Sequence, residues 1–121
     1  MSIHEKLKEL QVGYLTGDMG FLDGRANLVM VHGAGGNAMI WQNQIRFLDK
    51  DLNVLALDLP GHGKSKGEGY NSIQEYAQWL GDILRNIFDE PIFLMGHSMG
   101  GAIVQEAAFT YPDILKGIIL K

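Results

Sequence analysis

The chain has 121 residues, 46% of them hydrophobic, with 14 acidic and 10 basic side chains and a formal net charge of −4. This size and composition predict at most one folded domain, and the scattered Lys and Arg residues argue against nucleic acid or a membrane surface as a partner. The absence of cysteine excludes disulfides, thiolate metal sites and a cysteine nucleophile.

Short apolar runs alternate along the chain with segments of helical periodicity, a pattern typical of parallel strands joined by crossover helices. An antiparallel edge strand is predicted within residues 10–16, in an N-terminal segment formed by residues 1–25. The main unit, residues 26–121, has four apolar runs without polar alternation, as expected for strands covered on both faces. These runs are residues 28–31, 53–57, 92–95 and 117–120.

Three helices are predicted between these strands. Asn37 can cap the first, and Ser72-Ile73-Gln74-Glu75 fits the capping box at the start of the second, which must end before Pro91. The third runs from about residue 98 to residue 111. The sequence therefore predicts an α/β fold with a mostly parallel sheet and helices on both faces.

The motif Gly96-His97-Ser98-Met99-Gly100 lies between a predicted strand and a predicted helix, which is the setting of a nucleophile elbow. An isolated G-x-S-x-G is a weak signal, because Ser98 could simply cap the helix. Here Gly96 and Gly100 remove side chains where strand and helix nearly touch, which would lift the Ser98 hydroxyl above the sheet. The Met99 N–H, at the helix N-terminus, would face the oxyanion that forms on attack. The motif predicts that Ser98 is a catalytic nucleophile.

Two further motifs precede this one, His32-Gly33-Ala34-Gly35-Gly36 and Asp58-Leu59-Pro60-Gly61-His62-Gly63-Lys64-Ser65. With the serine motif they make residues 26–121 resemble the α/β-hydrolase family, in particular its esterase, lipase and C–C-hydrolase branch. The resemblance implies a serine hydrolase that cleaves carboxylic esters or related small-molecule acyl substrates through an acyl-enzyme, without a cofactor. It also implies that the Ala34 N–H is the second oxyanion donor. A serine at position 98 argues against the branches that use an Asp nucleophile.

The sequence also predicts that the catalytic triad is incomplete. The family order is Ser, then Asp or Glu, then His, whereas Asp58 precedes Ser98 and is expected to be structural. The residues after Ser98 include Glu106 and Asp113 but no His. We therefore expect a partial α/β-hydrolase fold and a truncated, inactive chain. We also expect the apolar strand at residues 117–120 to pair with a second copy, giving a dimer or larger oligomer.

Two other interpretations remain open. Residues 33–38 also satisfy G-x-G-x-x-G/A, and Asp58 ends the next strand, as in a dinucleotide-binding Rossmann-type module. That interpretation leaves residues 96–101 without a role. The other is a non-catalytic, self-associating fragment. A P-loop is excluded, because it needs Gly where the chain has Asp58.

The remaining polar signals predict no metal site. His32, His62 and His97 lack metal-ligand spacing, and each lies in a Gly-rich turn where an imidazole can bond to backbone groups of the loop. Residues 1–9 lack the apolar core of a signal peptide, and no apolar run could span a bilayer. A cytoplasmic protein is expected.

Overall fold

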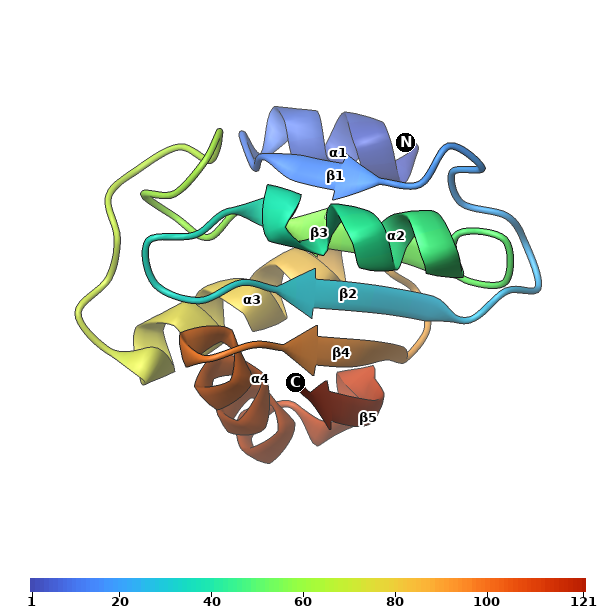
Figure 1. Cartoon of the computed structure of the whole chain (residues 1–121). Helices are drawn as coiled ribbons and strands as arrows, with labels where there is room; N and C mark the ends of the chain where they lie inside the picture. The colour runs from blue at the N-terminus through green and yellow to red at the C-terminus, as the bar shows by residue number, and fades with distance from the viewer.

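The computed structural model describes residues 1–121 and contains one five-stranded sheet with the strand order β1-β3-β2-β4-β5 (Figure 1). Strands β2 to β5 run parallel, and only β1, at the edge, is antiparallel to its neighbour β3. This confirms the mostly parallel sheet and the N-terminal edge strand. The strands are β1 (Tyr14–Thr16), β2 (Asn27–Val31), β3 (Asn53–Leu57), β4 (Ile92–Gly96) and β5 (Leu115–Leu120).

Helices cover both faces of the sheet, as predicted (Figure 1). On one face the 3-10 segment η1 and helix α2 place Trp41 and Ile45 against alternate residues of β2 and β3. On the other face α1, α3 and α4 enclose a larger core that includes Leu80 and Ile103. The helical segments are α1 (Ile3–Glu9), η1 (Ala38–Trp41), α2 (Gln42–Leu48), α3 (Ile73–Ile87), α4 (Met99–Thr110) and the 3-10 turn η2 (Pro112–Ile114).

The register of the parallel strands brings the three glycine-rich motifs together. Val31, at the end of β2, is level with Leu57 of β3 and Gly96 of β4. The loops that follow these strands leave the sheet at the C-terminal ends of β2 and β4, where their arrows point, on the left of Figure 1. In open α/β sheets, ligands bind at the C-terminal ends of the parallel strands.

The N-terminal segment differs from the sequence expectation. Helix α1 was not predicted, although Ser2 and Glu5 form a reciprocal capping box at its start and Leu7 is fully buried. The strand within residues 10–16 is shorter than expected because Gln11 adopts a left-handed conformation (φ 59°) directly after α1. The chain can therefore extend along β3 only from Tyr14 onward.

Two helix starts also differ in detail. Asn37 caps the first helix by accepting the Met39 N–H at 2.8 Å, but the first turn is the 3-10 segment η1. Ser72 caps α3 by accepting the Glu75 N–H at 3.1 Å. The other half of the capping box is absent, because the Glu75 carboxylate accepts the Ser72 hydroxyl and not the Ser72 N–H.

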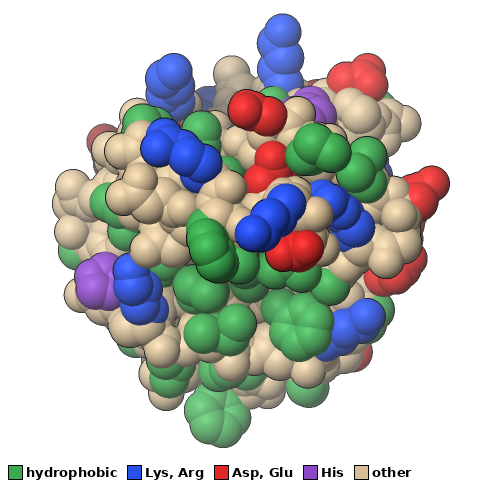
Figure 2. All heavy atoms as spheres, turned by 45° about the vertical axis from the view of Figure 1, so that its right-hand side comes forward, with side chains coloured by type: hydrophobic (Ala, Val, Ile, Leu, Met, Phe, Trp, Pro, Cys, Tyr) green, Lys and Arg blue, Asp and Glu red, His purple; other side chains and the backbone are tan.

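Charged and hydrophobic side chains are unevenly distributed on the face that Figure 2 shows. Figure 2 shows Lys, Arg, Asp and Glu gathered on the upper part of one face and hydrophobic side chains over its lower part, at the level of β4 and β5. Exposed apolar residues of the chain include Phe47, Phe109, Ile119 and Leu120. None of the helices is both long enough and apolar enough to cross a bilayer.

Candidate active site

Ser98 lies in a sharp turn between β4 and α4. Its backbone angles, φ 58° and ψ −123°, place a non-glycine residue in a region that L-amino acids rarely adopt. Such strain is typical of functional sites. Ser98 stands at the N-cap position of α4, yet its hydroxyl makes no capping hydrogen bond and is exposed. A simple capping role for Ser98 is therefore wrong, and the hydroxyl has no hydrogen-bond partner within the chain.

The two flanking glycines are required by close backbone contacts. A Cβ at Gly96 would lie 2.3 Å from the Gly100 carbonyl oxygen, and a Cβ at Gly100 would lie 2.2 Å from the Val31 carbonyl oxygen. These atoms belong to the backbone and cannot rotate aside. The N-terminus of α4 therefore packs directly on β4, as the spacing of the motif predicts, and also on the end of β2, which the motif did not predict.

The turn after β2 contacts the serine. A Cβ at Gly33 would lie 3.0 Å from the Ser98 Cβ and 3.4 Å from its hydroxyl oxygen. The turn is closed by the Gly36 N–H, which donates to the Gly33 carbonyl at 3.1 Å. The N–H groups of Ala34 and Met99 donate to no group of the protein. Both N–H groups therefore lack a partner within the chain.

Asp58 is buried and holds two loops together. Its Oδ1 accepts the Ala38 N–H at 2.7 Å, at the start of η1, and its Oδ2 accepts the Lys64 N–H at 2.9 Å. The Ser65 hydroxyl donates to the Asp58 carbonyl and accepts the Gly13 N–H. This arrangement supports the structural role expected for Asp58. The link through Ser65 to the N-terminal segment was not predicted, since no sequence motif marks Gly13.

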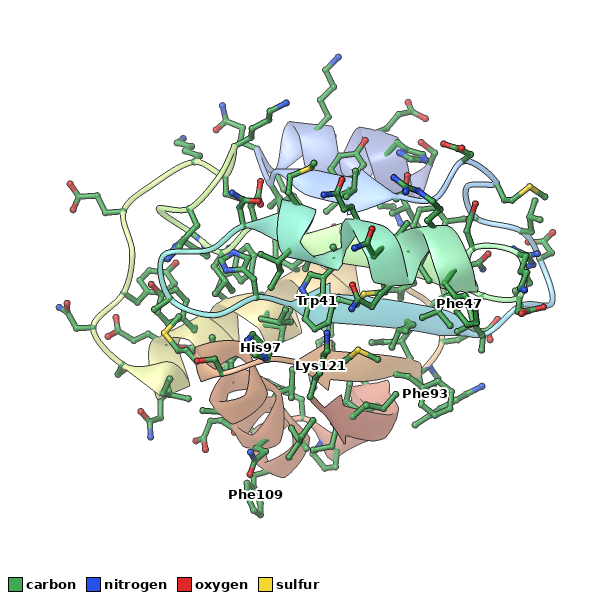
Figure 3. All side chains as sticks on the ribbon, in the orientation of Figure 1. Trp41, Phe47, Phe93, His97, Phe109 and Lys121 are labelled. Carbon is green, nitrogen blue, oxygen red and sulfur yellow. The ribbon has the colours of Figure 1, made fainter.

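Three histidines bond to backbone groups, and His32 and His62 bond within the Gly-rich turns as their sequence context predicts. His32 is fully buried and bonds to Gly33 and Leu59, and the partly exposed His62 bonds to Gly35 and Pro60. The exposed His97 has its Nδ1 3.3 Å from the Lys121 carbonyl, and Figure 3 shows it beyond the end of β4. Burial lowers the pKa of His32, which keeps the ring neutral.

No histidine or carboxylate forms a hydrogen bond with the Ser98 hydroxyl. His4, the fourth histidine, bonds to the Tyr14 hydroxyl at 2.9 Å, on the N-terminal segment. The structure thus brings together the serine, its flanking glycines and the Gly33 turn, without a histidine or carboxylate bonded to the serine. No three Asp, Glu or His side chains gather in a metal-binding cluster.

The comparisons with known proteins agree with this geometry. Residues 26–121 match the family model described as the alpha/beta hydrolase fold. The chain is 36% identical over 90 residues to (E)-2-((N-methylformamido)methylene)succinate hydrolase of Acinetobacter baylyi, covering 74% of this chain and 34% of that protein. It is 32% identical over 97 residues to pimeloyl-[acyl-carrier protein] methyl ester esterase of Salmonella newport, covering 80% of this chain and 36% of that protein.

Solved structures show the same similarity. A lipase-esterase related protein from Clostridium acetobutylicum superposes with a TM-score of 0.80 at 29% identity, covering 91% of this chain and 46% of that one. The monoacylglycerol lipase of Paleococcus ferrophilus has a TM-score of 0.77 at 31% identity, with coverages of 91% and 42%. The chain spans 34% and 36% of the lengths of the two curated relatives named above.

The dinucleotide-binding interpretation of residues 33–38 is not supported. It requires an Asp58 carboxylate that a ribose can reach, whereas Asp58 is only 5% exposed and both its oxygens accept backbone N–H groups. The family match covers all three motifs, including residues 96–101, which that interpretation left without a role. The chain belongs to the α/β-hydrolase family.

Proposed function

We propose that this chain carries the nucleophile of a serine hydrolase and that Ser98 forms an acyl-enzyme with carboxylic esters or related small acyl substrates. The observation that carries the proposal is the strained, exposed and uncapped Ser98 at a turn where strand, helix and the Gly33 turn meet. The relatives named as a hydrolase and as a methyl ester esterase support the same class of reaction.

The proposed reaction has two steps. A histidine takes the proton of the Ser98 hydroxyl while its oxygen attacks the acyl carbonyl, forming a tetrahedral oxyanion that the N–H groups of Ala34 and Met99 stabilise. The C–O bond to the leaving alcohol breaks, and the histidine returns the proton to that alcohol. Water then attacks the acyl-enzyme in the same way, releasing the acid and restoring Ser98.

We further propose that the general base and its acid partner come from residues outside this segment. All four histidines of the chain bond elsewhere: His32 and His62 to loop backbone, His4 to Tyr14 and His97 to Lys121. An unassisted serine hydroxyl is a weak nucleophile, and loss of triad members costs about 10⁶ in kcat. The 121 residues alone should therefore be inactive toward esters.

The test uses the natural protein that contains these residues. A fluorophosphonate probe should label it at Ser98, and it should cleave a short-chain acyl ester. Ser98→Ala should abolish both, whereas Ser72→Ala, which removes only the α3 cap, should keep both. Labelling or turnover that persists in Ser98→Ala would remove Ser98 from its proposed role.

A further inference from the structure

Two imidazole rings connect the turn after β2 to the loop after β3. The His32 Nε2 accepts the Leu59 N–H at 3.0 Å, and its Nδ1 is 2.7 Å from the Gly33 carbonyl. The His62 Nε2 accepts the Gly35 N–H at 3.1 Å, and its Nδ1 is 3.0 Å from the Pro60 carbonyl. The ring centroids are 5.1 Å apart.

These contacts define the protonation state of both rings. A nitrogen that accepts an N–H carries no proton, so each Nε2 is bare. Each Nδ1 faces a carbonyl oxygen, which can only accept, so each Nδ1 carries the proton. Both histidines are therefore neutral Nδ1–H tautomers. Burial, and to a smaller extent the neighbouring His62, lower the pKa of His32. The hydrogen bond to the Gly33 carbonyl and the charge of Asp58 raise it, but the net effect is a lowered pKa.

The bonds act on the two peptide planes that flank Ala34. The Gly33 carbonyl and the Ala34 N–H belong to one planar peptide group, so His32 fixes the direction of that N–H by holding the carbonyl. The Ala34 carbonyl and the Gly35 N–H belong to the next group, which His62 holds. Gly35 has φ 74° and no side chain to restrict the turn. The Gly36 N–H also donates to the Gly33 carbonyl, and the two rings add restraint to a turn that is rich in glycine.

We propose that His32 and His62 act as a pair of positioning residues that aim the Ala34 N–H at the oxyanion. This inference rests on the proposed function, because it assigns the Ala34 N–H to that oxyanion. Neither ring touches the substrate. A preorganised donor costs no rearrangement during the reaction, whereas an Ala34 turn held only by the Gly36–Gly33 hydrogen bond would be less ordered before each turnover.

His62 is the better residue to test, because it is only partly buried and its removal leaves the core intact. Gln places an acceptor oxygen about where Nε2 stands and keeps an N–H donor, so His62→Gln retains the contact with Gly35. His62→Phe retains a ring but offers no acceptor. His4→Phe, on the N-terminal segment, serves as a matched control.

The first measurement uses the 121-residue chain and does not depend on activity. Long-range ¹⁵N–¹H NMR spectra should show His62 as the Nδ1–H tautomer, and the Gly35 amide should be protected from hydrogen exchange. Protection should be lost in His62→Phe and kept in His62→Gln and His4→Phe. A protonated His62 Nε2, or equal Gly35 protection in all variants, would overturn the inference.

The second measurement uses the natural protein, with active sites counted by fluorophosphonate labelling so that misfolded molecules do not contribute. His62→Phe should lower kcat about ten- to a hundredfold, less than the roughly 10²- to 10³-fold loss on removing an oxyanion donor, with KM nearly unchanged. His62→Gln should restore most of kcat. If Ser98→Ala abolishes turnover while His62→Phe keeps its kcat, the positioning role fails and the proposed function stands. If Ser98→Ala remains active, the proposed function fails, and with it the assignment of the Ala34 N–H to an oxyanion.

Discussion

The Cα of Gly33 lies so close to Ser98 that a methyl group on it would be 3.0 Å from the Ser98 Cβ. Two turns that are far apart in the sequence therefore meet at the hydroxyl. A side chain at position 33 would occupy space beside the Ser98 hydroxyl oxygen, where the proposed reaction would need room for the acyl carbonyl. The glycine of the first motif and the serine of the third thus form one site.

Alanine at Gly100 should disrupt the elbow, whereas alanine at Gly101 should not. A Cβ added at Gly100 would lie 2.2 Å from the Val31 carbonyl oxygen. A Cβ added at Gly101 would have its nearest neighbour, the Gly96 carbonyl oxygen, 3.6 Å away. Within a helix Ala is favoured over Gly by about 0.5–1 kcal/mol. In thermal unfolding followed by circular dichroism, Gly101→Ala should melt at or above the parent temperature and Gly100→Ala well below it. Equal melting temperatures would contradict the contact.

Replacing Asp58 with Asn should affect stability more than chemistry. The substitution leaves one acceptor oxygen where two backbone N–H groups need one each, at the start of η1 and in the loop before Ser65. The melting temperature should fall, while kcat of the natural protein should stay within about tenfold of the parent value. Removing a triad member would instead lower kcat by a factor on the order of 10⁴ or more. A loss as large as that of Ser98→Ala would make Asp58 catalytic.

His32 should make the folded state less stable in mild acid. Burial lowers its pKa below the ordinary value of 6.5, so the unfolded chain binds a proton that the folded chain does not. The contribution of neutral His32 to the free energy of unfolding is complete at pH values above 6.5. It is lost as the pH falls toward the lowered pKa, by up to about 1.4 kcal/mol per pH unit. Urea unfolding should show this slope below neutral pH, and His32→Gln should flatten it. An equal slope in both proteins would exclude His32 as its source.

NAD and NADP should not change the melting temperature of the chain. The Asp58 carboxylate that would bind a ribose is only 5% exposed and already accepts the N–H groups of Ala38 and Lys64. A ligand that binds only the folded state must stabilise it. A saturable increase in melting temperature with either nucleotide would restore the dinucleotide-binding interpretation.

The isolated 121 residues should self-associate through β5. This strand lies at the edge of the sheet, and its Ile119 and Leu120 are 44% and 52% exposed. Unpaired edge strands with apolar side chains pair readily with another copy. Sedimentation velocity should detect a dimer or larger species that Ile119→Lys weakens, while Phe109→Ser, on α4, should not weaken it. A monomer at all concentrations would argue against this interface.

Most of the fold was predictable because it depends on local pattern. The unbroken apolar runs of β2 and β3 and the G-x-S-x-G motif are visible in the sequence, and the structure confirms the strands and the sharp turn. The contacts between loops were not predictable. Pairs such as Gly35 with His62, or Gly13 with Ser65, depend on which loops the sheet register brings together. Side chains that bond to backbone leave no periodic signal in the sequence.

The position of β2 also affects how the chain folds during synthesis. It leaves the ribosome before both of its partners, since β3 and β4 come later in the chain and flank it on opposite sides. Each parallel pair forms only after a crossover segment has been made and folded back, and such non-local pairing is slow. We therefore expect Ser98, which directly follows β4, to reach its strained conformation only after β2 and β4 have paired.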